Sequence, residues 1–136
     1  MANEAILVFR TAMPIPFTCD NGTGIEKGAL LKLTDPMTAS SANGTNDFVC
    51  GVAASEKVAS DGKTKLGIYR NGIFRFYLSG SCVAGDSVGS IADSVNFVAK
   101  NSDTTLSGCR VVGNALEDGA TGEQILVELN PTSKGV

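Results

Sequence analysis

The chain has 136 residues, 16 of them glycine, with no tryptophan or histidine and a formal net charge of −3. Its length suits one domain with a real core, and short apolar runs separated by small residues are typical of turn-rich all-β proteins. The eleven Lys and Arg residues are scattered and the apolar runs are short, so we expect neither nucleic acid nor a membrane among the partners.

Residues 1–18 are predicted to form an extended N-terminal arm before a single domain, residues 19–136. An apolar run at residues 5–9 comes first, and Pro14 and Pro16 follow; each proline lacks the N–H that a central strand donates. The apolar run needs a cover, either the chain's own barrel or another chain, and both alternatives stay open. Removing residues 2–17 is expected to leave a folded domain. The candidate partner-binding residues are Ile6, Leu7, Val8, Phe9, Pro14, Ile15, Pro16 and Phe17.

A glycine-rich stretch follows the arm and precedes an apolar run at residues 28–33. A dinucleotide-binding fingerprint would need a third glycine where Lys27 stands, and no Gly-Lys-Ser/Thr sequence closes a phosphate loop. Gly22, Gly24 and Gly28 are therefore interpreted as turn residues that allow positive φ before a strand.

The middle of the chain is predicted to form short strands joined by polar turns. We expect a strand at residues 28–33, a polar loop at 34–47, a buried strand at 48–54 and a connection at 56–63. Residues 63–78 alternate with period two and predict two strands, or one bent strand, around Asn71-Gly72. Leu66 and Ile68 share one face, and Phe74, Phe76 and Leu78 share another.

The C-terminal half repeats this pattern, with strands expected near residues 87–91, 95–99, 109–116 and 123–129. Ile125, Val127 and Leu129 alternate in the last of these. The halves also match loosely at Gly28 with Gly85, Gly51 with Gly113, and Leu66 and Ile68 with Ile125 and Val127, at offsets of 57, 62 and 59 residues. Either an internal β-duplication or chance in a glycine-rich chain accounts for this match. The predicted fold class is all-β, a small antiparallel β-barrel or β-sandwich.

Side chains for catalysis or metal binding are sparse. Cys19, Cys50, Cys82 and Cys109 form no C-x-x-C pair and have no histidine beside them, so they are interpreted as buried small residues, with disulfides as the alternative. Without histidine or an S-x-x-K spacing, we expect no enzyme.

Acidic residues gather at Glu117, Asp118 and Glu123, but their spacing does not match a calcium loop. A solvated loop is the preferred interpretation, and we expect no metal and no cofactor. An enzyme with an unrecognised acidic site is the least favoured functional hypothesis.

Three stretches carry a resemblance: "RNGIFRFYLSG", "VAGDSV" and "VVGNALEDGATGEQILVELNP". Together they resemble the capsid cement, or head decoration, proteins of tailed bacteriophages, over about residues 62–131. The chain departs from that pattern at Asn114, where a small apolar residue is usual, and in its four cysteines.

This resemblance implies a small β-barrel or β-sandwich protein without enzymatic activity. It implies a homotrimer on the exterior of an icosahedral capsid, assembled in the host cytoplasm, that bridges neighbouring subunits of the major capsid protein. The alternative is a carbohydrate- or cell-surface-binding β-module of a virion spike or fibre. Sugar sites usually stack their ligand on aromatic rings, and the chain offers Tyr69 and Tyr77 but no tryptophan.

Overall fold

The computed structural model describes residues 3–44, 47–91, 96–101 and 109–134, without the side chains of 109 and 132–134. This part of the chain is all strand and loop, and it holds no helix that is long and apolar enough to cross a membrane. The strands are β1 (Ile6–Phe9), β2 (Ile15–Thr18), β3 (Leu30–Asp35), β4 (Thr38–Ser41), β5 (Val49–Ala53), β6 (Lys65–Tyr69), β7 (Gly72–Ser79), β8 (Ser87–Ser90), β9 (Phe97–Lys100), β10 (Cys109–Ala115) and β11 (Gln124–Lys134).

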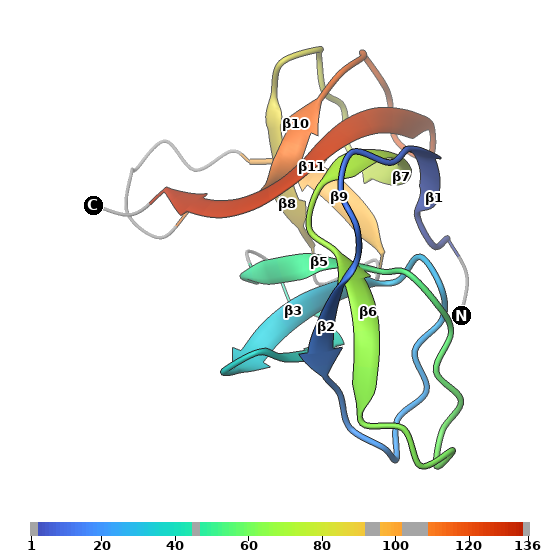
Figure 1. Cartoon of the computed structure of the whole chain (residues 1–136). Coiled ribbons are helices and arrows are strands. Elements are labelled where there is room, and N and C mark those ends of the chain that lie inside the picture. The colour runs from blue at the N-terminus through green and yellow to red at the C-terminus, as the bar shows by residue number, and fades with distance from the viewer. Residues whose placement is uncertain (1–2, 45–46, 92–95, 102–108, 135–136) are drawn as a thin grey trace.

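Strands β2 to β6 close into a first barrel in the order β2-β4-β3-β5-β6 (Figure 1). All its neighbouring strands are antiparallel except β2 and β4, which pair in parallel at Thr18 and Thr38. The interior is filled by alternate side chains of these strands and their loops. These are Phe17, Cys19, Ile25, Ala29, Leu31, Ala39, Cys50, Ala53, Leu66 and Ile68.

Strands β7 to β11 form a second barrel in the order β7-β11-β10-β8-β9, closed by the parallel pair β7–β9. In β7 the predicted alternation holds, since Phe74, Phe76 and Leu78 are all buried. The buried residues of β11 are Ile125, Val127 and Leu129, as predicted. Strand β1 lies beside the first half of β7 and extends that sheet without belonging to the ring.

The two barrels have the same connectivity, strand for strand. β2 to β6 correspond in order to β7 to β11, and each pairing of the first barrel, including the parallel one, recurs in the second. An isolated bridge precedes the last strand of each barrel, Ile25 with Lys57 and Cys82 with Gly119. These bridges are separated by the predicted offsets of 57 and 62 residues. The topology therefore confirms an internal β-duplication.

Two matched glycines show what the repeat preserves. Gly51 of β5 and Gly113 of β10 both lie where the neighbouring strand passes very close. A Cβ on Gly51 would collide with the carbonyl oxygen of Tyr69, and one on Gly113 with that of Glu128. Each barrel thus requires glycine at the same crossing of its last two strands.

The barrels share one apolar interface. Leu30, Val49 and Val52 turn their side chains out of the first barrel and into a core cluster with residues of the second, among them Phe74 and Val127. Buried Asn96, just before β9, accepts a hydrogen bond from the backbone N–H of Leu30 at 3.0 Å through Oδ1. Strands β3 and β5 therefore contribute side chains both to the interior of the first barrel and to the interface, which explains why β5 is buried along its whole length.

Four expectations differ from this architecture. Residues 34–47, predicted as a loop, contain β4, because Asp35 to Thr38 form a tight turn with Met37 at φ 49°. The two strands around Asn71-Gly72 do not pair with each other, since β6 belongs to the first barrel and β7 to the second. The sheets are also not purely antiparallel. Of the three glycines predicted to need positive φ before β3, Gly28 has it, at 88°, whereas Gly22 and Gly24 do not.

The N-terminal segment is extended, and it supplies β2 to the first barrel and β1 to the sheet that forms the second (Figure 1). Pro16 fits in β2 because its missing N–H faces an unused side of the strand. The carbonyl of Gly67, which lies opposite Pro16 in β6, accepts a hydrogen bond from the N–H of Ala54 and therefore points away from Pro16. On the opposite side of β2, strand β4 pairs only at Thr18. Pro16 therefore lies in a barrel strand with a neighbour on each side, at a position where no backbone donor is required.

Candidate interaction surface

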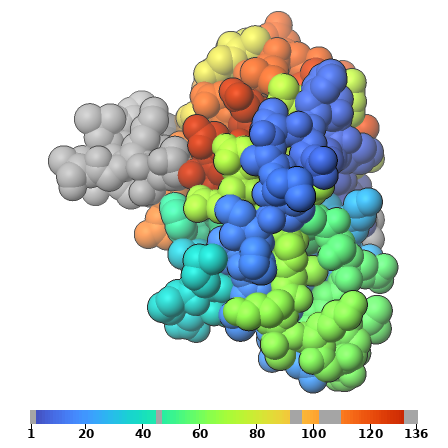
Figure 2. Space-filling model, in the orientation of Figure 1, coloured from blue at the N-terminus to red at the C-terminus, as the bar shows by residue number. Residues whose placement is uncertain are grey.

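Exposed apolar side chains concentrate on the N-terminal segment. Ile6, Phe9, Met13 and Ile15 are 53%, 61%, 69% and 42% exposed. Together with Val8 and Pro16 they form what we call the apolar band. Figure 2 shows this segment crossing one face of the molecule over both barrels. Such a concentration of exposed apolar residues on one face is a signature of an interaction site.

Strand β1 presents three of these residues through a local irregularity. Ile6 and Val8 point outward, and Leu7 between them packs against the second core. Regular alternation would turn Phe9 inward with Leu7. Leu7 pairs with Phe74 of β7, however, and Phe9 pairs with the adjacent Ile73, so the register shifts between Leu7 and Phe9. This β-bulge turns the large ring of Phe9 toward solvent.

Strand β1 is also an edge strand. One side of it pairs with β7, and no strand in the described part of the chain pairs with the other. Its outer edge therefore offers backbone donors and acceptors beside exposed apolar side chains. A strand of another chain could add to such an edge.

The segment is held firmly at both ends. The backbone N–H of Ala5 donates to the carbonyl of Gly28 at 2.8 Å, and that of Thr18 donates to Met37 at 2.7 Å. A Cβ on Gly28 would meet Ala5 and Glu4, so glycine is required for this close approach. The apolar band is consequently presented on an ordered scaffold, which reduces the entropy lost on binding.

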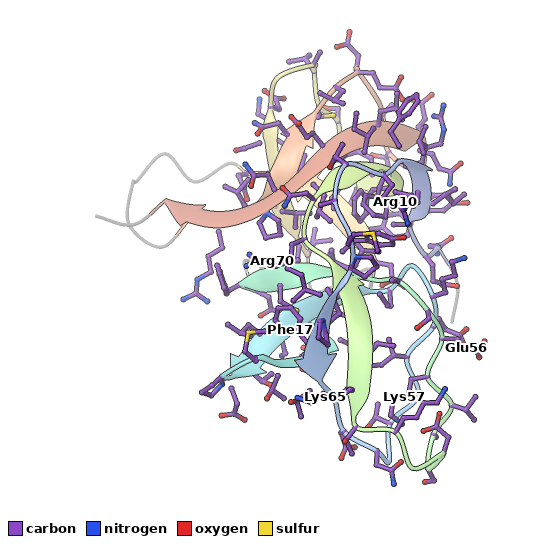
Figure 3. All side chains as sticks on the ribbon, viewed as in Figure 1. Arg10, Phe17, Glu56, Lys57, Lys65 and Arg70 are labelled. Atoms are coloured by element: carbon purple, nitrogen blue, oxygen red, sulfur yellow. The ribbon has the colours of Figure 1, made fainter. Side chains whose placement is uncertain are left out.

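The predicted partner-binding residues divide between surface and core. Ile6, Val8, Phe9, Ile15 and Pro16 are exposed. Phe17 is buried in the first barrel, and Figure 3 places it there, away from Arg10 on the β1 side. Leu7 and Pro14 are partly buried, the latter over Gly67, whose added Cβ would lie 3.3 Å from that of Pro14.

Sequence reasoning missed Met13, the most exposed large apolar residue of the segment. Its position directly before Pro14 was the available signal, since a residue before proline is restricted to extended conformations. Arg10 lies exposed between Phe9 and Met13 and adds a positive charge within the apolar band.

The cysteines with described side chains occupy core positions. Cys19, Cys50 and Cys82 are free and buried. Burial raises the pKa of the Cys50 thiol to about 12, and burial also raises the pKa of Cys19 and Cys82. These three thiols are therefore poor nucleophiles at neutral pH. The side chain of Cys109 lies outside the described residues.

The acidic loop residues cap turns. Asp118 accepts from the backbone of Ala84 at 2.9 Å, and Glu123 accepts from Ala120 at 2.6 Å. Glu117 accepts from Leu126 at 3.0 Å and lies 3.7 Å from Arg75. Within the described ranges, no group of three or more His, Cys, Asp or Glu side chains is arranged to hold a metal ion.

Comparison with known proteins finds a shared fold. No protein-family model and no curated protein matches the chain. Among solved structures it is similar to the N base of head fiber gp8.5 in bacteriophage phi29, with a TM-score of 0.56 and 18% identity. The match covers 87% of this chain and 95% of that one. The fold described above therefore also occurs in the base of a phage head fibre.

Proposed function

We propose that this chain is a structural, non-enzymatic protein of a phage virion that binds the outside of the capsid through the apolar band. The observation that carries the proposal is the fold shared with a head-fibre base along nearly the whole of both chains. The resemblance of residues 62–131 to capsid cement proteins supports the same assignment independently, because it rests on sequence motifs and not on the fold.

The apolar band gives this proposal a physical basis. Burying apolar surface contributes about 25 cal/mol per Å², and a standard interface buries roughly 1,600 Å² in total. Pairing of a capsid strand with the edge of β1 would add backbone hydrogen bonds to that contact. The proposed partner is the major capsid protein, and the proposed assembly is a homotrimer that bridges neighbouring capsid subunits.

Binding to undecorated capsids tests the proposal. Purified chain is mixed with capsids of the same phage, and the bound fraction is measured by co-sedimentation at increasing concentration. We expect saturation at a fixed ratio of chain to capsid subunit. The exchange Phe9→Asp should weaken binding at least about tenfold, since it places a charge in an apolar contact.

Val58→Asp is the matched control for Phe9→Asp. Val58 is 60% exposed, close to the 61% of Phe9, but it lies in the loop after β5 and outside the apolar band. We expect this variant to bind like the wild type. Equal binding by the two variants would exclude the apolar band as the contact surface, and no binding by the wild type would exclude the function.

A second candidate, the base of a head fibre, is favoured by the description of the structural neighbour. The two candidates differ in what binding does to the shell. A cement protein should raise the temperature at which capsids rupture, because it bridges subunits. A fibre base should bind in a fixed ratio and leave that temperature unchanged, which differential scanning calorimetry of decorated and bare capsids measures.

A further inference from the structure

A cleft of about 580 Å³ lies beneath the start of the N-terminal segment. Both barrels line it, the first through Lys27 and Tyr69 and the second through Tyr77 and Gln124. Residues 3–7 form one wall of it, so Ile6 belongs both to the cleft and to the apolar band. A partner that covers the band therefore also reaches the mouth of the cleft.

Glu4 places an uncompensated carboxylate on this wall. Its Oε2 is buried and has no hydrogen-bond partner, and no cationic group among the described residues lies within 4.0 Å of the carboxylate. A buried acceptor without a donor is unfavourable, and a buried charge normally has a counter-ion. A ligand that brings positive charge and N–H donors would supply both.

The aromatic residues of the cleft suit a planar cation. Tyr69 and Tyr77, the two tyrosines of the chain, both line it. Their rings are held against Phe74 and Phe97, with centroids 5.8 Å and 5.5 Å apart. Guanidinium groups stack on such rings and are weakly hydrated, which makes arginine better suited than lysine to a partly buried aromatic site. The formal charge of −3 of the whole chain also favours a cationic ligand.

We propose that this cleft binds an arginine side chain of the protein that covers the apolar band, with Glu4 as its counter-ion and the two tyrosines as its walls. The identity of the partner rests on the proposed function, whereas the arginine chemistry does not. Buried arginine residues in aromatic pockets are common anchors of protein interfaces. Lys27, exposed on the lining, opposes the ligand's charge and weakens binding.

Titration with a blocked arginine tests the chemistry without any capsid. The probe is N-acetyl-arginine N-methylamide, added to isotope-labelled protein while backbone NMR signals of Tyr69, Tyr77 and Gln124 are followed. The matched probe is the citrulline analogue, which has nearly the same shape but no charge. We expect saturable shifts with arginine and at least about tenfold weaker binding of citrulline.

Three variants assign the site. Glu4→Gln should weaken arginine binding about tenfold, and Lys27→Gln should strengthen it roughly twofold because it removes a like charge. Glu56→Gln changes the net charge equally at an exposed position outside the cleft and should bind like the wild type. Equal affinity of wild type and Glu4→Gln, or of arginine and citrulline, would overturn the proposal, as would no shift with either probe.

Capsid binding by the same variants separates this inference from the proposed function. We expect Glu4→Gln to weaken capsid binding at least about threefold while Glu56→Gln does not. Full capsid binding by Glu4→Gln would show that the partner inserts no arginine, and it would leave the assignment of the apolar band intact.

Discussion

At the scale of single residues, Lys57 is the least expected core side chain of the molecule. Its side chain is fully buried, and Nζ donates to the carbonyls of Asn21 and Val58 at 2.7 and 3.1 Å and to Asp61 at 3.3 Å (Figure 3). The backbone N–H of Lys63, together with Lys57, lowers the pKa of Asp61, which keeps that carboxylate charged beside the ammonium. Lys57 thereby joins the loops that follow β2 and β5.

The exchange Lys57→Met should destabilise the fold by about 1–3 kcal/mol, because it removes the donor that the carbonyls of Asn21 and Val58 share. Lys63→Met, at an exposed position of the same loop, is the control and should change stability by less than about 0.5 kcal/mol. Urea unfolding of both variants measures the difference. Similar midpoints for the two variants would show that the buried ammonium contributes nothing to stability.

The exchange Gly113→Ala should cost about 1–3 kcal/mol, since an added Cβ meets the backbone of Glu128, which cannot move aside as a flexible side chain would. Gly22→Ala is the control. A Cβ there meets one side-chain oxygen of Asp20 at 3.4 Å and the backbone is not left-handed. Thermal unfolding followed by circular dichroism compares them, and equal melting temperatures would contradict the close strand crossing.

At the scale of elements, β1 and β2 differ in what they support. Strand β2 closes the first barrel and carries the buried Phe17, whereas β1 extends a sheet whose ring is complete without it. The structure therefore changes the expectation for truncation. Removing residues 2–17 takes away a barrel strand, so the remaining domain is not expected to stay folded.

Deletion of residues 2–17 should unfold the chain, while deletion of residues 2–10 should leave both barrels folded with a lower urea midpoint. The shorter deletion still loses Ala5 and Leu7 from the second core, which accounts for the reduced stability. The dispersion of amide NMR signals distinguishes the outcomes. Well-dispersed spectra from the longer deletion would restore the prediction of a dispensable arm.

At the scale of the whole molecule, the shared interface should make unfolding cooperative. Tyr69 lies in the first barrel and Tyr77 in the second, so Tyr69→Phe and Tyr77→Phe each leave one fluorescent reporter. We expect the same urea midpoint from both variants. Added to either tyrosine variant, Leu30→Ala should lower the free energy of unfolding by about 2–5 kcal/mol, because Leu30 packs in the interface between the barrels. Separate transitions would show that the barrels unfold independently.

The sequence predicts the strands better than their partners. Alternation located β7 and β11 and their buried faces, because burial of alternate residues determines which side chains are apolar, and a compact apolar run located β5. The glycine matches indicated a repeat, with chance as the alternative, because Gly51 and Gly113 meet the same steric demand. Strand pairing depends on contacts between residues that are far apart in the chain. The sequence therefore indicated neither that β6 and β7 belong to different barrels nor that two strand pairs are parallel.

The candidate surface was predicted in part. The sequence located the apolar segment but left open what covers it, and its exposure pattern depends on the bulge before Phe9, which alternation alone does not reveal. The sequence alone did not indicate the cleft. Glu4, Lys27, Tyr69 and Tyr77 are far apart in the chain and share one site only after both barrels have formed.

The position of β1 also has a consequence for synthesis. On the ribosome, residues 15–69 contain every strand of the first barrel, whereas β1 must wait for β7, which emerges more than sixty residues later. During that interval β1 lacks its partner strand. Premature association at this point is a hazard that a chaperone, or rapid translation, would have to limit.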